Sequence, residues 1–265
     1  MPSFRPETLA AIEATIRALH IARAGIDASA IRSKGGRDLV TSTDMAVEDV
    51  VTQYLTTQLA YPVIGEERGG DPPDYGDPYW LVDPICGTRN LASGVPLFCT
   101  NLALVEDGAV TVSVIGDASR RELLVAERGG GAWVMNDGSR ERICTSTDSN
   151  TIIVEEGKSR DVRRTEAARF MARMILCDRW DVRNFGSTVS LPYVAAGRVA
   201  AYAVFCVPAL HAAAGQLLVT EAGGCVTDID GHPWTLESDT LLAAANVDLY
   251  ADVFAIRDVL ASKTD

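Results

Sequence analysis

One acidic strand end carries most of the chemistry that the sequence suggests. In the segment WLVDPICGTRNL, residues 80–91, a buried strand ends at Asp83. Glu66 lies in the preceding acidic turn, so its carboxylate and that of Asp83 could meet around one cation. The Ile85 carbonyl could add a third oxygen ligand. Hard oxygen donors of this kind suit Mg²⁺, so the segment predicts a magnesium site.

The charge of the chain restricts its partners. Among 265 residues, 36 are acidic and 24 are Lys or Arg, for a formal net charge of −12. A nucleic-acid or anionic-membrane partner would need clustered basic residues, so neither is expected. A phosphorylated small molecule remains compatible with this charge. A metal ion, or the free amides of a helical turn opened by Gly87 and Thr88, would supply local positive potential.

The cysteine and histidine content limits which disulfides and metal centres are expected. Six cysteines are scattered without CxxC pairs, which predicts reduced thiols and a cytoplasmic protein. With only three histidines, a multi-histidine metal centre is not expected. No segment approaches the roughly 20 apolar residues that span a bilayer.

The elements that must position this chemistry follow from hydrophobic periodicity and turn signals. The sequence predicts two N-terminal helices, the first with an apolar face of Leu9, Ile12, Ile16 and Leu19. The second is expected from Asp44 to Leu59, capped by Thr43 or Asp44. Four β-rich runs then predict an antiparallel meander, between about residues 98 and 134.

The pattern changes to alternating strands and helices after about residue 149. Strands are expected at 62–64, 80–83, 152–155, 200–206 and 241–245, and later helices at 160–174, 187–196, 211–222 and 249–261. Two halves are therefore predicted. Residues 1–148 form an α+β half with the metal and phosphate motifs, and residues 149–265 an α/β half packed with it as one body.

Several ordered motifs together resemble the inositol monophosphatase family of Mg²⁺-dependent phosphatases. They cover nearly the whole chain: DLVTSTDMAVE (38–48), IGEE (64–67), DPICGT (83–88), FGSTVSLPYVAAG (185–197) and the helix 211–224 that ends in EAGG. The resemblance implies an α/β fold, a layered αβαβα sandwich, and frequent homodimers. It also implies hydrolysis of small phosphate monoesters with two or three Mg²⁺ ions.

The resemblance assigns roles to individual residues. Glu66, Asp83 and the Ile85 carbonyl stand where the family binds its first metal ion. Thr88, together with Glu66, stands where the attacking water is activated, and Asp44 lies at the supporting acidic position. The positions expected to contact phosphate or substrate are Cys86, Gly87, Thr88, Arg89, Gly186, Ser187 and Val204.

This chain departs from the family pattern at four acidic positions. Cys86 and His211 replace two metal-binding aspartates, and two further acids upstream of His211 have become Ala200 and Val204. Thiol and imidazole are poor ligands for Mg²⁺. The second metal site of the family should therefore lose most of its affinity for Mg²⁺.

Three interpretations of Cys86 and His211 stay open. The pair is a degenerate metal site beside one remaining Mg²⁺, or forms with Asp83 a three-ligand site for a softer ion such as Zn²⁺. The third interpretation is a thiol–imidazole dyad or a general acid–base histidine. In that case Cys86 would lie near a helix N-terminus, which lowers a thiol pKa.

The sequence therefore predicts a phosphate-handling enzyme with an altered metal centre. Its expected substrate is a phosphorylated sugar, cyclitol or nucleotide-derived metabolite. One alternative is a non-hydrolytic enzyme, a lyase or isomerase that uses His211 or Cys86. Another is a catalytically inactive binding or regulatory homologue. A basic loop at residues 34–37 is a further place that could close over an anionic substrate.

Overall fold

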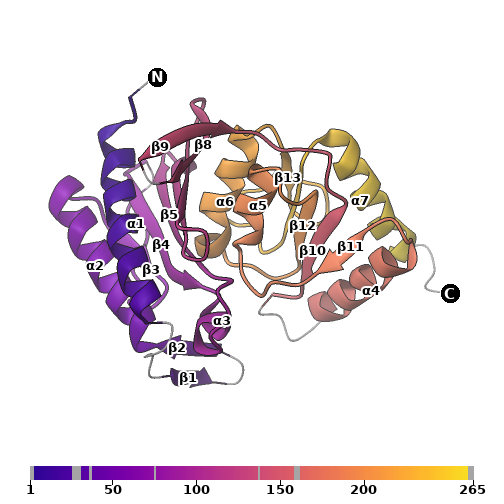
Figure 1. The fold of residues 1–265 in the computed structure, drawn as a ribbon, viewed down its shortest axis with the longest axis horizontal. Helices are drawn as coiled ribbons and strands as arrows, with labels where there is room; N and C mark the ends of the chain where they lie inside the picture. The colour runs from indigo at the N-terminus through magenta and orange to yellow at the C-terminus, as the bar shows by residue number, and fades with distance from the viewer. Residues whose placement is uncertain are drawn as a thin grey trace.

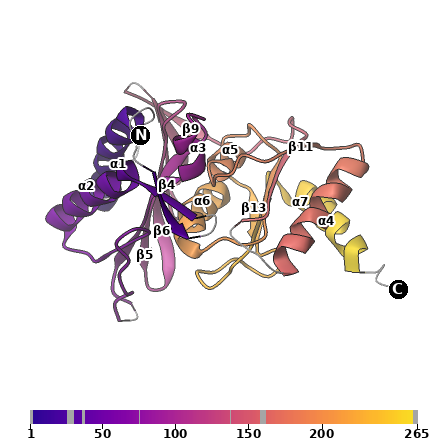
Figure 2. The same cartoon turned by 90° about the horizontal axis from the view of Figure 1, so that it is seen from below.

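The computed structural model describes residues 3–25, 31–35, 38–74, 76–136, 138–157 and 162–261. Two large sheets and seven helices within these ranges stack in five layers, α, β, α, β and α (Figures 1 and 2). This arrangement confirms the predicted layered α/β sandwich. No helix in the described ranges is long and apolar enough to span a membrane.

The first sheet has seven strands in the order β3-β4-β5-β6-β7-β8-β9. Its strands are Val63–Gly65, Tyr79–Cys86, Cys99–Glu106, Ala109–Asp117, Glu122–Glu127, Gly131–Asn136 and Ser139–Ile143. Strands β4 to β9 pair antiparallel in sequence order, which confirms the predicted four-stranded meander and adds β4 and β9 to it. Only β3 and β4 pair in parallel within this sheet.

Strand β4 runs further than predicted. It continues past Asp83 to Cys86, and its pairing with β5 shifts register between these two residues. Proline at position 84 cannot donate a ladder hydrogen bond, so the strand bulges there instead of ending. The bulge contains Asp83, Ile85 and Cys86, which are all predicted site residues.

Helices α1 (Pro6–Ala24) and α2 (Ser42–Leu59) form the outer layer on the first sheet. The apolar face predicted for α1 is partly wrong, because Leu9 and Ile16 are 54% and 41% exposed. Small residues face the interior instead, among them Ala11 and Ala18, which are fully buried. Small side chains let the helix axis approach its neighbours closely.

Helix α2 begins earlier than expected, after Thr41 rather than at Thr43 or Asp44. The Thr41 hydroxyl accepts from the Asp44 amide, and the Asp44 carboxylate accepts from the Thr41 amide at 2.9 Å. This reciprocal capping box fixes the first turn of the helix. It also holds the Asp44 carboxylate at the edge of the site.

The central layer contains α5 (Ser190–Ala195) and α6 (Ala209–Glu221). Helix α6 contacts both sheets, and its first turn carries His211. Its alanines and Gly215 leave room for close packing, because a side chain at 215 would clash with Leu191 of α5. Helix α5 is shorter than predicted, and residues 187–189 form the turn that precedes it.

The second sheet has five strands in the order β11-β10-β12-β14-β13. They span Asp181–Arg183, Thr151–Glu155, Ala201–Val204, Leu241–Ala244 and Cys225–Thr227, and α4 (Val162–Leu176) with α7 (Val247–Ala261) forms the outer layer on this side. Strands β10 and β12 are parallel, so Glu155 and Val204 lie side by side at one sheet end. A small hairpin of β1 (Ile31–Gly35) and β2 (Asp38–Thr41) precedes α2.

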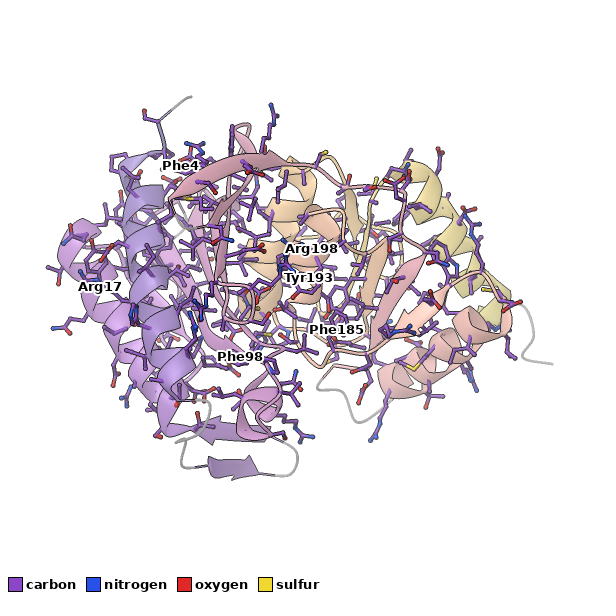
Figure 3. The ribbon with its side chains drawn as sticks, viewed as in Figure 1. Phe4, Arg17, Phe98, Phe185, Tyr193 and Arg198 are labelled. Atoms are coloured by element: carbon purple, nitrogen blue, oxygen red, sulfur yellow. The ribbon has the colours of Figure 1, made fainter. Side chains whose placement is uncertain are left out.

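Polar contacts tie the central layer to the first sheet. The Tyr193 hydroxyl donates to Asp117 at 3.0 Å, and Arg198 pairs with Glu122 at 2.5 Å. Both Tyr193 and Arg198 lie between the two sheets in Figure 3. One buried apolar cluster contains residues from both halves, including Ile115 and Tyr202. The domain boundary near residue 148 itself stays a prediction.

Candidate active site

A hydroxyl and a buried carboxylate form the first part of the site. The Thr88 hydroxyl is within hydrogen-bonding distance of Asp44 Oδ1 at 2.9 Å and of the Ile85 carbonyl oxygen at 3.1 Å. Asp44 is fully buried, and burial raises its pKa, although hydrogen bonds from Thr41 and Thr88 oppose that shift. The structure thus brings the predicted Asp44, Ile85 and Thr88 together.

The turn between β4 and the short helix α3 (Thr88–Ala92) requires glycine. Gly87 has φ of 109°, and a Cβ there would lie 2.9 Å from the Leu97 carbonyl oxygen. The Asn90 and Leu91 amides donate to the Gly87 carbonyl, which begins the helical turn predicted from the sequence. The Arg89 side chain is exposed on this turn. Contacts of residues 86–89 with phosphate stay predictions.

The acidic turn after β3 is held by a carboxylate of α2. Glu48 is buried, and its two oxygens accept from the Glu67 and Arg68 amides at 2.7 Å each. A side chain at Gly65 would clash with this carboxylate. The turn therefore keeps a defined shape. It places Glu66 Oε1 at 3.8 Å from His211 Nε2.

The second part of the site is a buried ion pair. His211 Nδ1 lies 2.6 Å from Asp83 Oδ2, which also accepts from Asn101 at 3.1 Å. The other oxygen, Asp83 Oδ1, is buried and has no hydrogen-bond partner among the described residues. Burial opposes charge on both groups, but their mutual attraction dominates. The pKa of His211 therefore lies well above its ordinary value and the pKa of Asp83 below its own.

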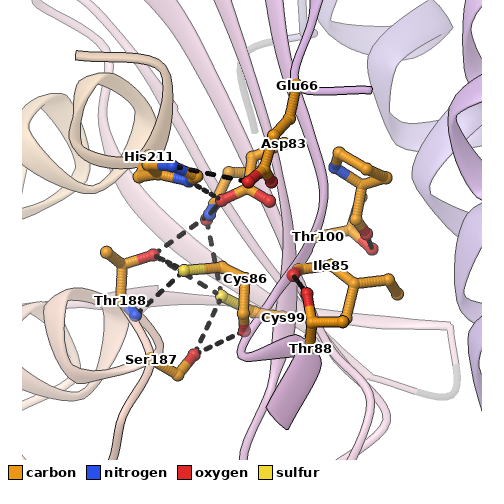
Figure 4. Close-up of polar contacts among 12 residues, drawn as sticks. Glu66, Asp83, Ile85, Cys86, Thr88, Cys99, Thr100, Ser187, Thr188 and His211 are labelled. Carbon is orange, nitrogen blue, oxygen red and sulfur yellow. Dashed lines mark hydrogen bonds and ion pairs between the residues drawn. The ribbon is translucent and has the colours of Figure 1, made fainter. Parts of the chain in front are cut away.

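Cys86 lies beside this pair and is enclosed by polar groups (Figure 4). Its Sγ accepts from the Thr188 amide at 3.2 Å and from the Thr188 hydroxyl at 2.9 Å. The prediction of a lowered thiol pKa is wrong. A hydrogen bond with Cys99, burial and the negative charge of Asp83 hold the pKa of Cys86 well above its ordinary value.

The segment 185–188 connects the second sheet to Cys86. The Ser187 hydroxyl donates to the Cys86 carbonyl at 2.6 Å, and the preceding Gly186 has φ of 64°. Glu155 Oε1 accepts from the Ser187 amide at 3.3 Å. Val204, predicted to contact substrate, is buried at the end of β12 beside Glu155. Its role in substrate binding stays a prediction.

Sequence reasoning missed three residues of this network: Asn101, Glu155 and Thr188. Glu155 is buried, and burial raises its pKa to about 7 despite hydrogen bonds from the segment 185–187 and from Tyr202. An acid at the end of an otherwise apolar strand was the available signal. Asn101 and Thr188 had no comparable signal, because their partners lie far away along the chain. The basic loop at 34–37 includes positions outside the described residues.

Comparison with known proteins shows the family of this chain. The family model for the inositol monophosphatase family matches residues 5–260. The chain belongs to the inositol monophosphatase family. Inositol-1-monophosphatase of Mesorhizobium japonicum is 33% identical over 234 residues, covering 87% of each chain. Nus factor SuhB of Pasteurella multocida is 36% identical over 217 residues, covering 80% of each chain.

Solved structures of this family share the fold. The IMPase of Thermotoga maritima matches with a TM-score of 0.83 and 26% identity, covering 95% of this chain and 96% of that one. The suhB protein of Bartonella henselae matches with a TM-score of 0.87 over 98% of this chain and 100% of that one. At 24% identity, the second match concerns the fold alone.

The residues fit one part of the Mg²⁺ chemistry that the inositol monophosphatase family implies. Glu66, Asp83 and the Ile85 carbonyl offer hard oxygens, and the unpartnered Asp83 Oδ1 is an acceptor that a cation would satisfy. The positions of Cys86 and His211 do not fit a second Mg²⁺. A thiol sulfur and an imidazole nitrogen are unsuitable ligands for a hard ion.

Proposed function

We propose that this protein hydrolyses a small phosphate monoester with one Mg²⁺ at Glu66, Asp83 and the Ile85 carbonyl. The observation that carries the proposal is the Thr88 hydroxyl, held by Asp44 and Ile85 just beyond the end of β4, the strand that carries the buried Asp83 carboxylate with its unpartnered oxygen. When bound, the cation would neutralise phosphate charge and acidify the attacking water.

The side chains would orient the water, accept its proton and contact the phosphate. With its hydrogen directed to Asp44, the Thr88 oxygen can accept a hydrogen bond from water and orient it toward phosphorus. Glu66 would take the proton that this water loses. The turn at residues 86–88 and the exposed Arg89 would contact the phosphate. Apolar Val204, where the family has an acid, favours a sugar, cyclitol or nucleotide-derived substrate with fewer hydroxyl contacts.

The test is release of phosphate from a broad panel of monoesters with and without Mg²⁺. We expect Mg²⁺-stimulated release, and Thr88→Val should lower kcat by about 10²–10⁴-fold because the water loses its orientation. Thr56→Val is the matched control, since Thr56 is exposed on α2 and its hydroxyl donates only within that helix. Absence of stimulated release from the whole panel would contradict hydrolysis.

The non-hydrolytic enzyme that uses His211 or Cys86 stays a second candidate function. Such an enzyme would perform a lyase or isomerase reaction on a phosphorylated compound. ³¹P NMR would then show turnover without inorganic phosphate, and His211→Ala would abolish it. An unaffected His211→Ala protein would remove this candidate.

The assembly, location and other partners of the protein rest on the sequence predictions. A homodimer in the cytoplasm, without nucleic-acid or membrane partners, is the proposed state. Size-exclusion chromatography with light scattering tests the dimer directly. If neither reaction is detected in the panel, a binding or regulatory role for this family member becomes the proposal to pursue.

A further inference from the structure

We propose that Asp83, Cys86 and His211 form a three-ligand site for a borderline-soft divalent ion, with Zn²⁺ as its occupant. One carboxylate oxygen, one sulfur and one imidazole nitrogen lie within 4.8 Å of one another (Figure 4). All three residues are buried. They come from the bulge of β4 and the first turn of α6. The inference goes beyond the proposed hydrolysis, because the ion site exists or fails whether or not phosphate is released.

Each of the three metal-ligating atoms has a neighbouring group that would orient it. Thr188 donates two hydrogen bonds to Cys86 Sγ, and Asn101 donates one to Asp83 Oδ2. Proteins support metal-bound thiolates, carboxylates and imidazoles by such outer contacts. Hydrogen bonds to sulfur are also stronger when it carries the charge of a thiolate.

The imidazole has a matching carboxylate on its far side. While His211 Nδ1 faces Asp83, Nε2 faces Glu66 Oε1 at 3.8 Å. A histidine that binds a metal through one nitrogen commonly directs the other toward a carboxylate, carbonyl or water. The three ligating residues are therefore of the types found in metal sites. The groups that contact them are also arranged as they are around a bound metal.

The donor types select the ion. Sulfur and imidazole nitrogen suit Zn²⁺ far better than Mg²⁺, and three protein ligands leave one tetrahedral position for water or substrate. Tetrahedral ligands at about 2.0–2.1 Å from Zn²⁺ lie roughly 3.3 Å apart. The present separation of 2.6 Å between His211 Nδ1 and Asp83 Oδ2 must therefore open by less than 1 Å when the ion binds. Asp83 Oδ1 stays available to a neighbouring hard cation.

Cobalt is the direct probe of this site, because Co²⁺ replaces Zn²⁺ and absorbs in the near ultraviolet when bonded to a thiolate. We expect the protein to take up about one Co²⁺ with this charge-transfer band. Zn²⁺ should abolish the band, whereas excess Mg²⁺ should leave it unchanged. Cys86→Ser should lose the band, and the exposed cysteine variants Cys144→Ser and Cys177→Ser should keep it.

A second variant keeps the test informative if Cys86→Ser folds poorly. Thr188→Val removes one of the two donors to the sulfur and should weaken Co²⁺ binding about 10–100-fold while the band keeps its shape. Absence of the band at excess Co²⁺, its persistence in folded Cys86→Ser, or equal displacement by Mg²⁺ would each overturn the proposal. Phosphate release plays no part in these measurements, so failure of hydrolysis is distinguished from failure of the metal site.

Discussion

The candidate site has two halves that differ in chemistry, and each would use the carboxylate of Asp83. The oxygen half consists of Asp44, Thr88 and the Ile85 carbonyl, linked by hydrogen bonds of 2.9 and 3.1 Å. The sulfur–nitrogen half consists of Cys86 and His211, with Thr188 and Asn101 behind them. Asp83 would serve both halves, because Oδ2 contacts His211 while Oδ1 has no partner among the described residues.

This difference indicates that the donor groups in one half of a site can change while those in the other half stay the same. The bulge of β4 directs Ile85 and Cys86 to different neighbours, so the groups around each are separate. We therefore expect a substitution at position 86 to leave the contacts of Thr88 intact. The oxygen half contains Asp44 and Thr88, which are predicted to activate water, while the sulfur–nitrogen half contains donor groups of another class.

The largest expected effect is at the residue that both halves share. Asp83→Ala removes the partner of buried His211, and breaking a buried ion pair costs about 3–5 kcal/mol. Urea unfolding measures this loss in the free energy of unfolding. The double variant Asp83→Ala/His211→Ala should be less destabilised than the sum of the single variants. Simple additivity would mean that the two groups do not interact.

The next largest effect concerns Glu155, which supports the segment 185–188 that contacts Cys86. Its folded-state pKa of about 7 lies above the ordinary 4.5, so its contribution to stability is full below about pH 4.5 and is lost as pH rises through 7. Over that range wild type should lose about 3 kcal/mol more than Glu155→Gln, which does not titrate. Unfolding free energies at about pH 5 and pH 8 measure the difference.

A matched acid at the surface provides the control for this prediction. Glu13 pairs with Arg17 on an exposed face of α1, so Glu13→Gln should follow the pH dependence of wild type. Equal pH dependence in wild type and Glu155→Gln would show that Glu155 does not hold its proton more tightly in the folded state.

A somewhat smaller effect is expected when the sulfur–nitrogen half is converted to oxygen. Cys86→Asp/His211→Asp gathers carboxylates around Asp83, and their repulsion should destabilise the metal-free protein. Mg²⁺ should then stabilise it, by about 2.7 kcal/mol at a concentration of 100 Kd. Thermal unfolding with and without Mg²⁺ measures this gain. An identical response in wild type would mean that the two halves already bind Mg²⁺ alike.

The smallest expected effect tests the support of the oxygen half. Thr41→Ala removes the cap of α2 and one partner of Asp44, at a cost of about 1 kcal/mol in the free energy of unfolding. Thr56→Ala, on the exposed surface of the same helix, should change stability by less than about 0.5 kcal/mol. Equal effects of the two substitutions would show that the cap does not anchor this half.

Much of the architecture was predictable because it rests on local signals. Alternating apolar residues and turn residues between positions 98 and 134 indicated the meander, and the structure confirms it. The predicted face of α1 was wrong at Leu9 and Ile16, because close contact with α2 and the sheet favours small residues over large ones. Periodicity shows that a helix has a face but not how near its neighbours approach.

The sequence by itself determined the fold family, the candidate ligands Glu66 and Asp83, and the departure at Cys86 and His211, since residue identity and motif order carry that information. Only the tertiary structure showed that Asn101 and Thr188 bond to Asp83 and Cys86, because these contacts join residues 18 and 102 positions apart. It also decided the direction of the Cys86 pKa. A nearby helix start predicts a lowered value, but burial, Cys99 and the charge of Asp83 outweigh it.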